Sequence, residues 1–150
     1  MRVFICDDNP SIISQLEQSI LNFHNTNKIE PPEIISYNTV VKKILVETKD
    51  GYYTVSSDDI ICVETDERHV AVHTVETTYI STQHISYFKS ILDGNNFTCS
   101  HKGVIVNMDY ISHFDKNRIY FKSDSLTAYI SRRRFNEFKD TYTTYLSYVK

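Results

Sequence analysis

The stretch NFTCSHKGVIVN, residues 96–107, decides the fold of the larger part of this chain. It contains two short runs of mainly β-branched and apolar residues, 97–100 and 104–107, on either side of the polar pair Lys102-Gly103. Because such runs favour strands and glycine favours a tight turn, the stretch predicts two short strands joined by a turn. Taken alone, Lys102-Gly103 is equally well interpreted as an ordinary turn with a solvated lysine.

The same composition continues on both sides of this stretch, where threonine, valine, isoleucine and tyrosine alternate with short turns. This pattern is typical of many short antiparallel strands. Strands are predicted at residues 44–48, 52–55, 60–65, 70–74, 78–81, 97–100, 104–107, 111–115, 118–122 and 126–130, with hairpin turns at Asp50-Gly51 and Lys116-Asn117. A short helix is expected at residues 85–92, before Gly94, and a final helix is expected after Ser131, with Phe135, Phe138, Tyr142 and Tyr145 on its packing face.

Residues 1–38 are organised differently, because they contain all three prolines of the chain. The apolar run at 3–6 predicts a buried parallel strand. A helix is expected from Pro10 and Ser11 onward, because apolar residues recur at helical spacing at Ile12, Ile13, Leu16, Ile20 and Phe23. A second strand is expected at residues 33–37. The predicted order is therefore β-α-β, with a domain boundary at 38–41.

The charge of the chain is unevenly distributed. The net charge of the 150 residues is −3, yet residues 97–150 hold 9 basic and 5 acidic side chains, whereas residues 42–96 hold 5 basic and 9 acidic ones. Positive charge is therefore concentrated in the C-terminal part, which favours an anionic partner there. No stretch is long and apolar enough for a membrane helix, and the odd count of three cysteines suits a reducing compartment. We therefore expect a cytoplasmic protein with no membrane partner.

Three consecutive arginines, Arg132 to Arg134, are expected in the first turn of the final helix. The helix dipole disfavours cations there by about 0.3–1 kcal/mol each. An anionic ligand such as a DNA phosphate would explain this placement. The alternative is that arginine is a good helix former and that a solvated triplet costs little free energy.

Patterns typical of catalysis or metal binding are weak. His69 and His73 share one strand face and Cys99 and His101 another, without the spacing of zinc ligands. No nucleophile motif and no glycine-rich phosphate loop occurs in the sequence. We therefore expect neither an enzyme nor a bound cofactor.

Residues 96–107 and the stretch ISRRRF, residues 130–135, resemble the LytTR family of DNA-binding domains, and residues 59–64 resemble the strand before that family's first DNA-contacting loop. The resemblance covers residues 42–146. It implies a mainly β fold, an elongated β-sandwich of short antiparallel strands with a C-terminal helix, which binds major grooves of direct-repeat sites through its loops. Lys102 and Gly103 stand where the family usually has arginine and serine.

The resemblance also implies roles for individual residues. Contacts to bases are carried over to His69, Lys102 and Arg132. Supporting or phosphate contacts are carried over to His101, Ser131, Arg133 and Arg134. Considered without the resemblance, a histidine at a strand start, such as His69, is more often an ordinary surface residue.

Residues 2–10 are similar to the opening of a response-regulator receiver domain, especially those of Agr-type regulators. Asp7 and Asp8 match the acidic pair that helps to bind magnesium in such domains. The third strand and its phosphorylated aspartate are missing, so residues 1–38 correspond to a partial receiver. Because two carboxylates alone make a poor magnesium site, we expect no phosphoryl transfer.

Together these features predict a transcriptional regulator that binds double-stranded DNA without control by phosphorylation. The alternative is an interaction module that inhibits a full-length response regulator by forming mixed oligomers through residues 1–38, whose strand edges are open. Residues 1–38 could equally pair with a second copy of this chain.

Overall fold

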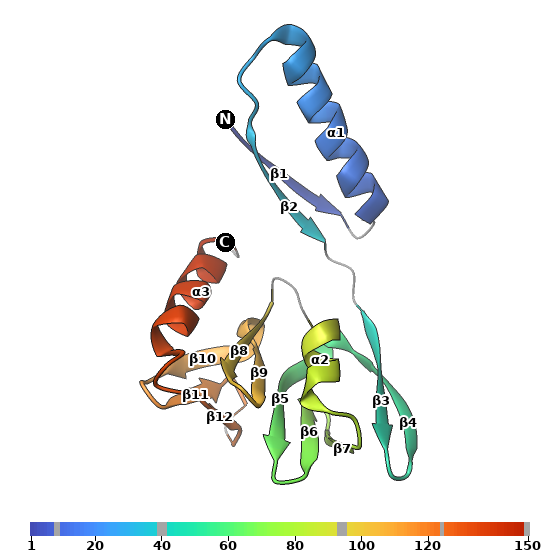
Figure 1. Cartoon of the computed structure of the whole chain (residues 1–150), viewed down its shortest axis with the longest axis vertical. Helices are drawn as coiled ribbons and strands as arrows, with labels where there is room; N and C mark the ends of the chain where they lie inside the picture. Colours follow the sequence, from blue (N-terminus) through green and yellow to red (C-terminus); the bar gives the residue numbers. More distant parts are fainter. Residues whose placement is uncertain (8–9, 39–41, 93–95, 124, 149–150) are drawn as a thin grey trace. The chain divides into compact units, whose positions relative to one another are not determined.

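The computed structural model describes residues 1–7, 10–38, 42–92, 96–123 and 125–148. The chain divides into two compact units, Met1–Lys42 and Lys43–Lys150. Both units are drawn in Figure 1. None of the helices among the described residues is long and apolar enough to cross a membrane.

The first unit has the predicted β-α-β order. Strands β1 (Arg2–Asp7) and β2 (Glu33–Asn38) form a parallel pair, and helix α1 (Pro10–Asn27) packs on them. The expectation that the first apolar run is buried holds for Ile5, which is 6% exposed, but was wrong for Phe4, which is 62% exposed. Successive side chains of a strand point to opposite faces, and α1 covers only one face of this small sheet. The other face carries the exposed Phe4 ring and the ion pair between Arg2 and Glu33.

The second unit is mainly β, as predicted, and consists of two antiparallel sheets (Figure 1). The larger sheet has the strand order β4-β3-β7-β6-β5-β9-β8, and the smaller one has the order β10-β11-β12. The strands are β3 (Lys43–Thr48), β4 (Gly51–Ser56), β5 (Ile60–Asp66), β6 (His69–Thr74), β7 (Thr78–Ser81), β8 (Phe97–His101), β9 (Val104–Asn107), β10 (Ile111–Phe114), β11 (Arg118–Phe121) and β12 (Thr127–Tyr129). Short 3-10 turns, η1 (Ser57–Asp59) and η2 (Met108–Tyr110), precede β5 and β10.

All the strands predicted in this unit are confirmed, each within one residue at either end. The first hairpin turn is shifted by one position from the expected Asp50-Gly51. Gly51 already pairs with Thr48 as the first residue of β4, so the turn residues are Lys49 and Asp50. Gly51 has a φ of 146°, a backbone angle that side-chain-bearing residues rarely adopt.

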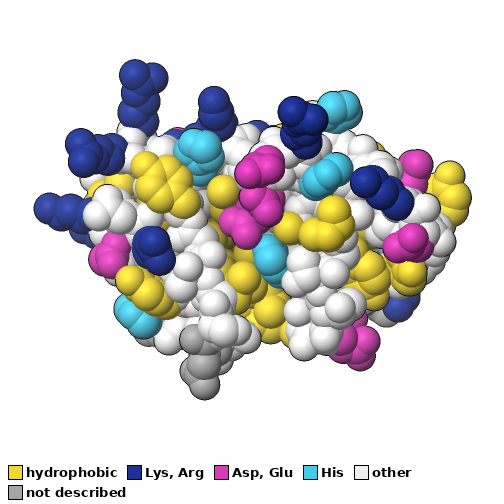
Figure 2. All heavy atoms as spheres, turned by 90° about the horizontal axis from the view of Figure 1, so that it is seen from below, with side chains coloured by type: hydrophobic (Ala, Val, Ile, Leu, Met, Phe, Trp, Pro, Cys, Tyr) yellow, Lys and Arg dark blue, Asp and Glu magenta, His cyan; other side chains and the backbone are white. Residues whose placement is uncertain are grey.

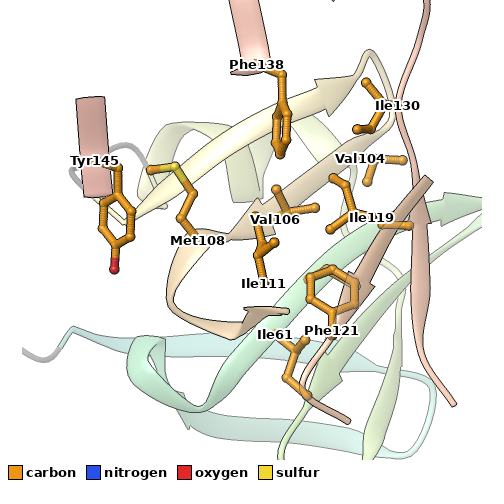
Figure 3. Packing of buried hydrophobic residues seen from close by; sticks show 12 residues of the cluster. Ile61, Val104, Val106, Met108, Ile111, Ile119, Phe121, Ile130, Phe138 and Tyr145 are labelled. Atoms are coloured by element: carbon orange, nitrogen blue, oxygen red, sulfur yellow. The ribbon is translucent and has the colours of Figure 1, made fainter. Parts of the chain in front are cut away.

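The large sheet buries apolar side chains on both faces. Helix α2 (Ile85–Ile91), which the sequence placed at 85–92, covers one face through Phe88. On that side the core also contains Val46, Val63, Val72, Leu92 and Ile105. Cys62, one position away along β5, belongs to the core on the opposite face. Val104 and Val106 of β9 point to the same core, where they meet Ile119 and Phe121 of the small sheet (Figure 3). Burial raises the pKa of the Cys62 thiol, so this thiol stays protonated.

Helix α3 (Phe135–Tyr148) completes the second core. The packing face was predicted correctly, because Phe138 and Tyr145 are buried and Phe135 and Tyr142 pack against the same cluster. The Phe114 ring of β10 lies edge-on to Phe138, with 5.3 Å between ring centroids. Burying one such large apolar side chain contributes about 1.5–3 kcal/mol.

The start of α3 differs from the expectation. Arg132 to Arg134 form a turn before the helix instead of its first turn. The amide of Arg134 donates to the carbonyl of Ser131 at 3.0 Å, three residues earlier. A bond of this spacing closes a 3-10-type turn and not a turn of α-helix. The carbonyl of Arg134 then accepts from the amide of Phe138 at 2.7 Å, which begins the helical pattern. The arginines therefore flank the helix N-terminus without belonging to it.

Asn107 is the last residue of β9, and its side chain is buried, with 1% exposed. Its Nδ2 donates to the carbonyl of Ile60 at 2.9 Å, and its Oδ1 accepts from the amide of Asp109 at 3.1 Å. A buried amide that loses such bonds leaves backbone groups without partners. Asn107 therefore fixes the end of β9 to the start of β5.

Replacing Asn107 by Ala should lower the free energy of unfolding by about 2–3 kcal/mol, because the buried carbonyl of Ile60 and the partly buried amide of Asp109 lose their partners. Urea unfolding followed by circular dichroism measures this change. Asn136→Ala, at an exposed position on α3, is the control and should change stability by less than about 0.5 kcal/mol. Equal stability of the two variants would contradict the assigned role of Asn107.

Candidate nucleic-acid interface

The predicted DNA-contacting residues lie on three turns of the second unit. We name them the histidine hairpin (residues 66–69), the lysine turn (residues 101–103) and the arginine turn (residues 131–134). The first two are far apart in sequence, but β5 and β9 pair side by side, with Glu64 opposite Val104. At the end of this pairing, the amide of Thr65 donates to the carbonyl of Gly103 at 2.8 Å. The histidine hairpin and the lysine turn are therefore neighbours.

The backbone of the lysine turn is held in place while its lysine side chain is exposed. The amide of Gly103 donates to Nδ1 of His101 at 3.3 Å, and Nζ of Lys89 in α2 donates to the carbonyl of Lys102. A Cβ atom on Gly103 would lie only 3.2 Å from Oγ1 of Thr65. A side chain at position 103 would therefore require the Thr65 side chain to shift by a few tenths of an ångström.

His101 is half-buried and packs against a neighbouring ring. Its imidazole lies edge-on to Tyr129, with ring centroids 5.4 Å apart. One of its ring nitrogens is already occupied by the amide of Gly103. His101 therefore shapes the lysine turn, which agrees with a supporting role better than with a base contact.

The arginine turn is attached to β8 next to the lysine turn. The amide of Ser131 donates to the carbonyl of Ser100 at 3.0 Å. Arg132 and Arg133 are exposed. The guanidinium of Arg134, in contrast, contacts the protein, because its Nη1 lies 3.4 Å from the carbonyl oxygen of Cys99 and 4.0 Å from the Glu137 carboxylate. Two of the three arginines thus have side chains directed to solvent.

Arg132 borders a shallow pocket of about 310 Å³ that is lined by Lys116, Asn117, Arg132 and Phe135. The turn between β10 and β11 forms one side of it. The Asp115 carboxylate holds this turn, since its Oδ1 accepts from the amides of Asn117 and Arg118 at 2.7 and 2.9 Å. Lys116 therefore adds a second cation beside Arg132 that the sequence did not single out.

The histidine hairpin has a mixed charge. His69 is exposed and pairs with Asp66 across the hairpin, and the turn between them consists of Glu67 and Arg68. Glu67 has a φ of 48°, a left-handed angle that closes the turn. Two carboxylates beside His69 oppose the approach of a phosphate backbone, so this hairpin is electrostatically the weakest of the three turns.

His73 is a structural residue. Its Nε2 lies 3.0 Å from Oε1 of Glu64, and its Nδ1 lies 3.0 Å from Oγ1 of Thr78. Both ring nitrogens therefore have protein partners. Among the residues that the structure describes, no group of three or more His, Cys, Asp or Glu side chains could hold a metal ion.

Charge is unevenly distributed over the face of the molecule that is seen from below in Figure 2. Figure 2 shows Lys and Arg side chains gathered along one side and the upper rim of the face, with His side chains among them and acidic side chains near the middle. Long, flexible cations around an exposed face are typical of contacts to a nucleic-acid backbone. The acidic group at its centre restricts where a phosphate chain can lie.

The sequence analysis missed three residues that hold these turns, Lys89, Ser100 and Tyr129. It placed Lys116 in a hairpin turn but gave it no role beside Arg132. Ser100 stands next to the predicted His101, which is a local signal for it. Lys89 lies on another element, and nothing in the sequence links it to Lys102. The acidic pair Asp7 and Asp8 lies outside the described residues, apart from the backbone of Asp7 in β1.

Comparisons with known proteins agree with this architecture. The model of the LytTr DNA-binding domain family matches residues 50–143. The transcriptional regulatory protein NatR of Bacillus subtilis (strain 168) is 26% identical over 105 residues, which are 67% of this chain and 45% of NatR, so the matched part spans less than half of that relative. A solved LytTr DNA-binding domain from Bacillus cereus, of a protein described as a methyl-accepting/DNA response regulator, matches with a TM-score of 0.58 and 18% identity, over 67% of this chain and 96% of that domain.

The Asp115 carboxylate should make the stability of this region depend on pH. The amides of Asn117 and Arg118 lower the pKa of Asp115. Its contribution is therefore present above the ordinary carboxyl pKa and is lost as the pH falls through the lowered value. The difference in unfolding free energy between the wild type and Asp115→Ala should shrink below about pH 4. Asp140→Ala, at an exposed position on α3, is the control, and a difference independent of pH would refute the role of Asp115.

Proposed function

Because this chain belongs to the LytTR family of DNA-binding domains, we propose that it is a transcriptional regulator that binds double-stranded DNA through the lysine turn and the arginine turn. The observation that carries this proposal is the placement of two exposed cations, Lys102 and Arg132, on neighbouring turns whose backbones are fixed by hydrogen bonds. Fixed turns lower the entropy that DNA binding would cost.

Each exposed cation has a defined chemical role in this proposal. Arg132 contacts a guanine edge, where its planar guanidinium can donate two hydrogen bonds. Lys102 contacts a base or a phosphate as a compact charge. Arg133 contacts phosphates, and Ser131 and His101 keep the turns in shape. His69 is retained as a base contact, although Asp66 and Glu67 beside it make it the weakest member.

We also propose direct-repeat DNA sites and independence from phosphorylation. The basis for direct repeats is family membership. The basis for phosphorylation independence is the short first unit, whose described elements are two strands and one helix. A receiver-like phosphorylation site would need a third strand that carries the acceptor aspartate, and after β2 the next strands belong to the second unit.

Arg132→Ala should weaken binding to the preferred duplex by about 1–3 kcal/mol and should relax the base preference, because a two-bond base contact is lost. Arg133→Ala should weaken preferred and shuffled duplexes equally, because phosphates carry no sequence information. Fluorescence anisotropy over a salt series measures both effects, using a duplex that the wild type enriches from a random-sequence library.

Lys49→Ala is the matched charge control, because Lys49 lies at the β3–β4 turn, near the edge of the large sheet opposite β8. It should leave the affinity nearly unchanged. Absence of salt-dependent binding by the wild type, or full affinity of Arg132→Ala, would rule out the proposed function.

A second function, inhibition of a full-length response regulator by mixed oligomers or self-association, is favoured by exposed aromatic side chains of the first unit. Phe4 of β1 and Phe23 of α1 are 62% and 60% exposed. Large exposed aromatic side chains on a small unit are typical of an interaction surface.

Deleting residues 1–38 distinguishes the two functions. A direct regulator should keep its Kd for DNA, because its DNA-contacting turns all lie in the second unit. An inhibitor should lose its ability to reduce DNA binding by a full-length LytTR response regulator in a competition assay. Equal inhibition with and without residues 1–38 would exclude the inhibitory role of the fragment.

A further inference from the structure

We propose that Ser100 is a positioning residue that fixes the lysine turn and the arginine turn relative to each other, and that DNA sequence preference depends on its hydroxyl group. This inference rests on the proposed DNA-binding function and deepens it. Ser100 is completely buried, so its effect on DNA would be exerted through Lys102 and Arg132.

Ser100 forms two hydrogen bonds to residues 129–131, the segment that leads into the arginine turn. Its Oγ donates to the carbonyl of Tyr129 at 2.7 Å, and its carbonyl accepts from the amide of Ser131 at 3.0 Å. Ile130, between these two partners, is completely buried in the second core. The segment is thus held by one residue of β8 on both sides of a core side chain.

A β-bulge makes Ser100 available for this role. On the β8–β9 ladder, Cys99 pairs with Ile105 and His101 pairs with Val104, so Ser100 is the extra residue between them. The backbone of a bulged residue is left out of the ladder, and the bulge redirects its side chain. Here both the carbonyl and the hydroxyl of the extra residue bind the segment at 129–131.

The two proposed DNA contacts lie at equal chain distances from this junction. Lys102 follows Ser100 by two residues, and Arg132 follows Ile130 by two residues. A shift of the segment at 129–131 against β8 would therefore change the spacing of the two cations without changing their number. Base contacts require accurate placement, whereas attraction to phosphates requires mainly charge.

Ser81 offers a matched control inside the same sheet. It is 1% exposed, and its Oγ donates to the carbonyl of Glu47 at 2.9 Å. It therefore has nearly the same burial and the same kind of hydrogen bond as Ser100. Ser81 lies on β7, and its partner carbonyl belongs to β3, away from the lysine and arginine turns in the strand order. Oγ of Ser81 also accepts from the amide of Gln83 at 3.1 Å, so removing the Ser81 hydroxyl should lower stability at least as much as removing that of Ser100.

The experiment compares the complete wild-type chain with Ser100→Ala, Ser81→Ala and Ser100→Thr. The probes are a duplex that the wild type enriches from a random-sequence library and a shuffled duplex of the same composition. The ratio of the two Kd values reports sequence preference, and its salt dependence reports the number of phosphate contacts. Hydrogen exchange of the Ser131 amide reports the junction without DNA.

We expect Ser100→Ala to reduce the preference ratio about tenfold, the effect of losing one good base contact, and to leave the salt dependence unchanged. The Ser131 amide should exchange faster in Ser100→Ala and at the wild-type rate in Ser81→Ala, once both are corrected for global stability. Ser100→Thr retains the hydroxyl and should retain the preference ratio, even if its additional methyl group lowers stability.

Two results would overturn this role. If Ser100→Ala keeps the preference ratio of Ser81→Ala, or if Ser100→Thr loses the ratio as completely as Ser100→Ala, the hydroxyl does not position the turns. A wild-type chain that enriches no duplex and binds DNA without salt dependence would instead refute the proposed function itself. The two failures are therefore distinguishable.

Discussion

The pairing of β5 with β9 is the constraint on which the second unit depends. These strands lie side by side in the large sheet although about forty residues separate them in the chain. Their side chains alternate between two cores, with Val63 and Ile105 toward α2 and Cys62 and Val106 toward the small sheet. At one end of the pair the Asn107 side chain donates a hydrogen bond to the carbonyl of Ile60. At the other end the amide of Thr65 donates to the carbonyl of Gly103. This pairing therefore links the two cores to each other and places two of the three turns side by side.

The same strand pairing positions the turns of the candidate interface. The histidine hairpin and the lysine turn extend from the ends of β5 and β9, and the arginine turn is joined to β8 through Ser100. The rigid part of each turn is backbone, held by hydrogen bonds that leave Lys102, Arg132 and Arg133 exposed. Rigid backbone with free cations suits a partner that is recognised by both position and charge. The first unit differs, because α1 packs on its two-stranded sheet while Phe4 of β1 is left exposed.

The strand positions were predictable because a period of two and frequent β-branched residues are local properties of the sequence. The packing face of α3 was predictable for the same reason, since Phe138 and Tyr145 recur at helical spacing. The burial of Phe4 was predicted wrongly, because an apolar run does not reveal whether a second layer covers it. The start of α3 was also misplaced, because the hydrogen bond between Arg134 and Ser131 that closes a turn before the helix is not encoded in helix propensity.

The sequence by itself determined the mainly β character, the order of the elements, the uneven charge and the family resemblance that identified Lys102 and Arg132. These are carried by neighbouring residues and by composition. Only the tertiary structure decided that Arg134 turns toward the carbonyl of Cys99, that Lys89 supports the lysine turn and that Ser100 joins two turns. Each of these contacts links segments at least 13 residues apart. The contacts of Ser100 also depend on strand register and on a β-bulge, which local sequence patterns do not specify.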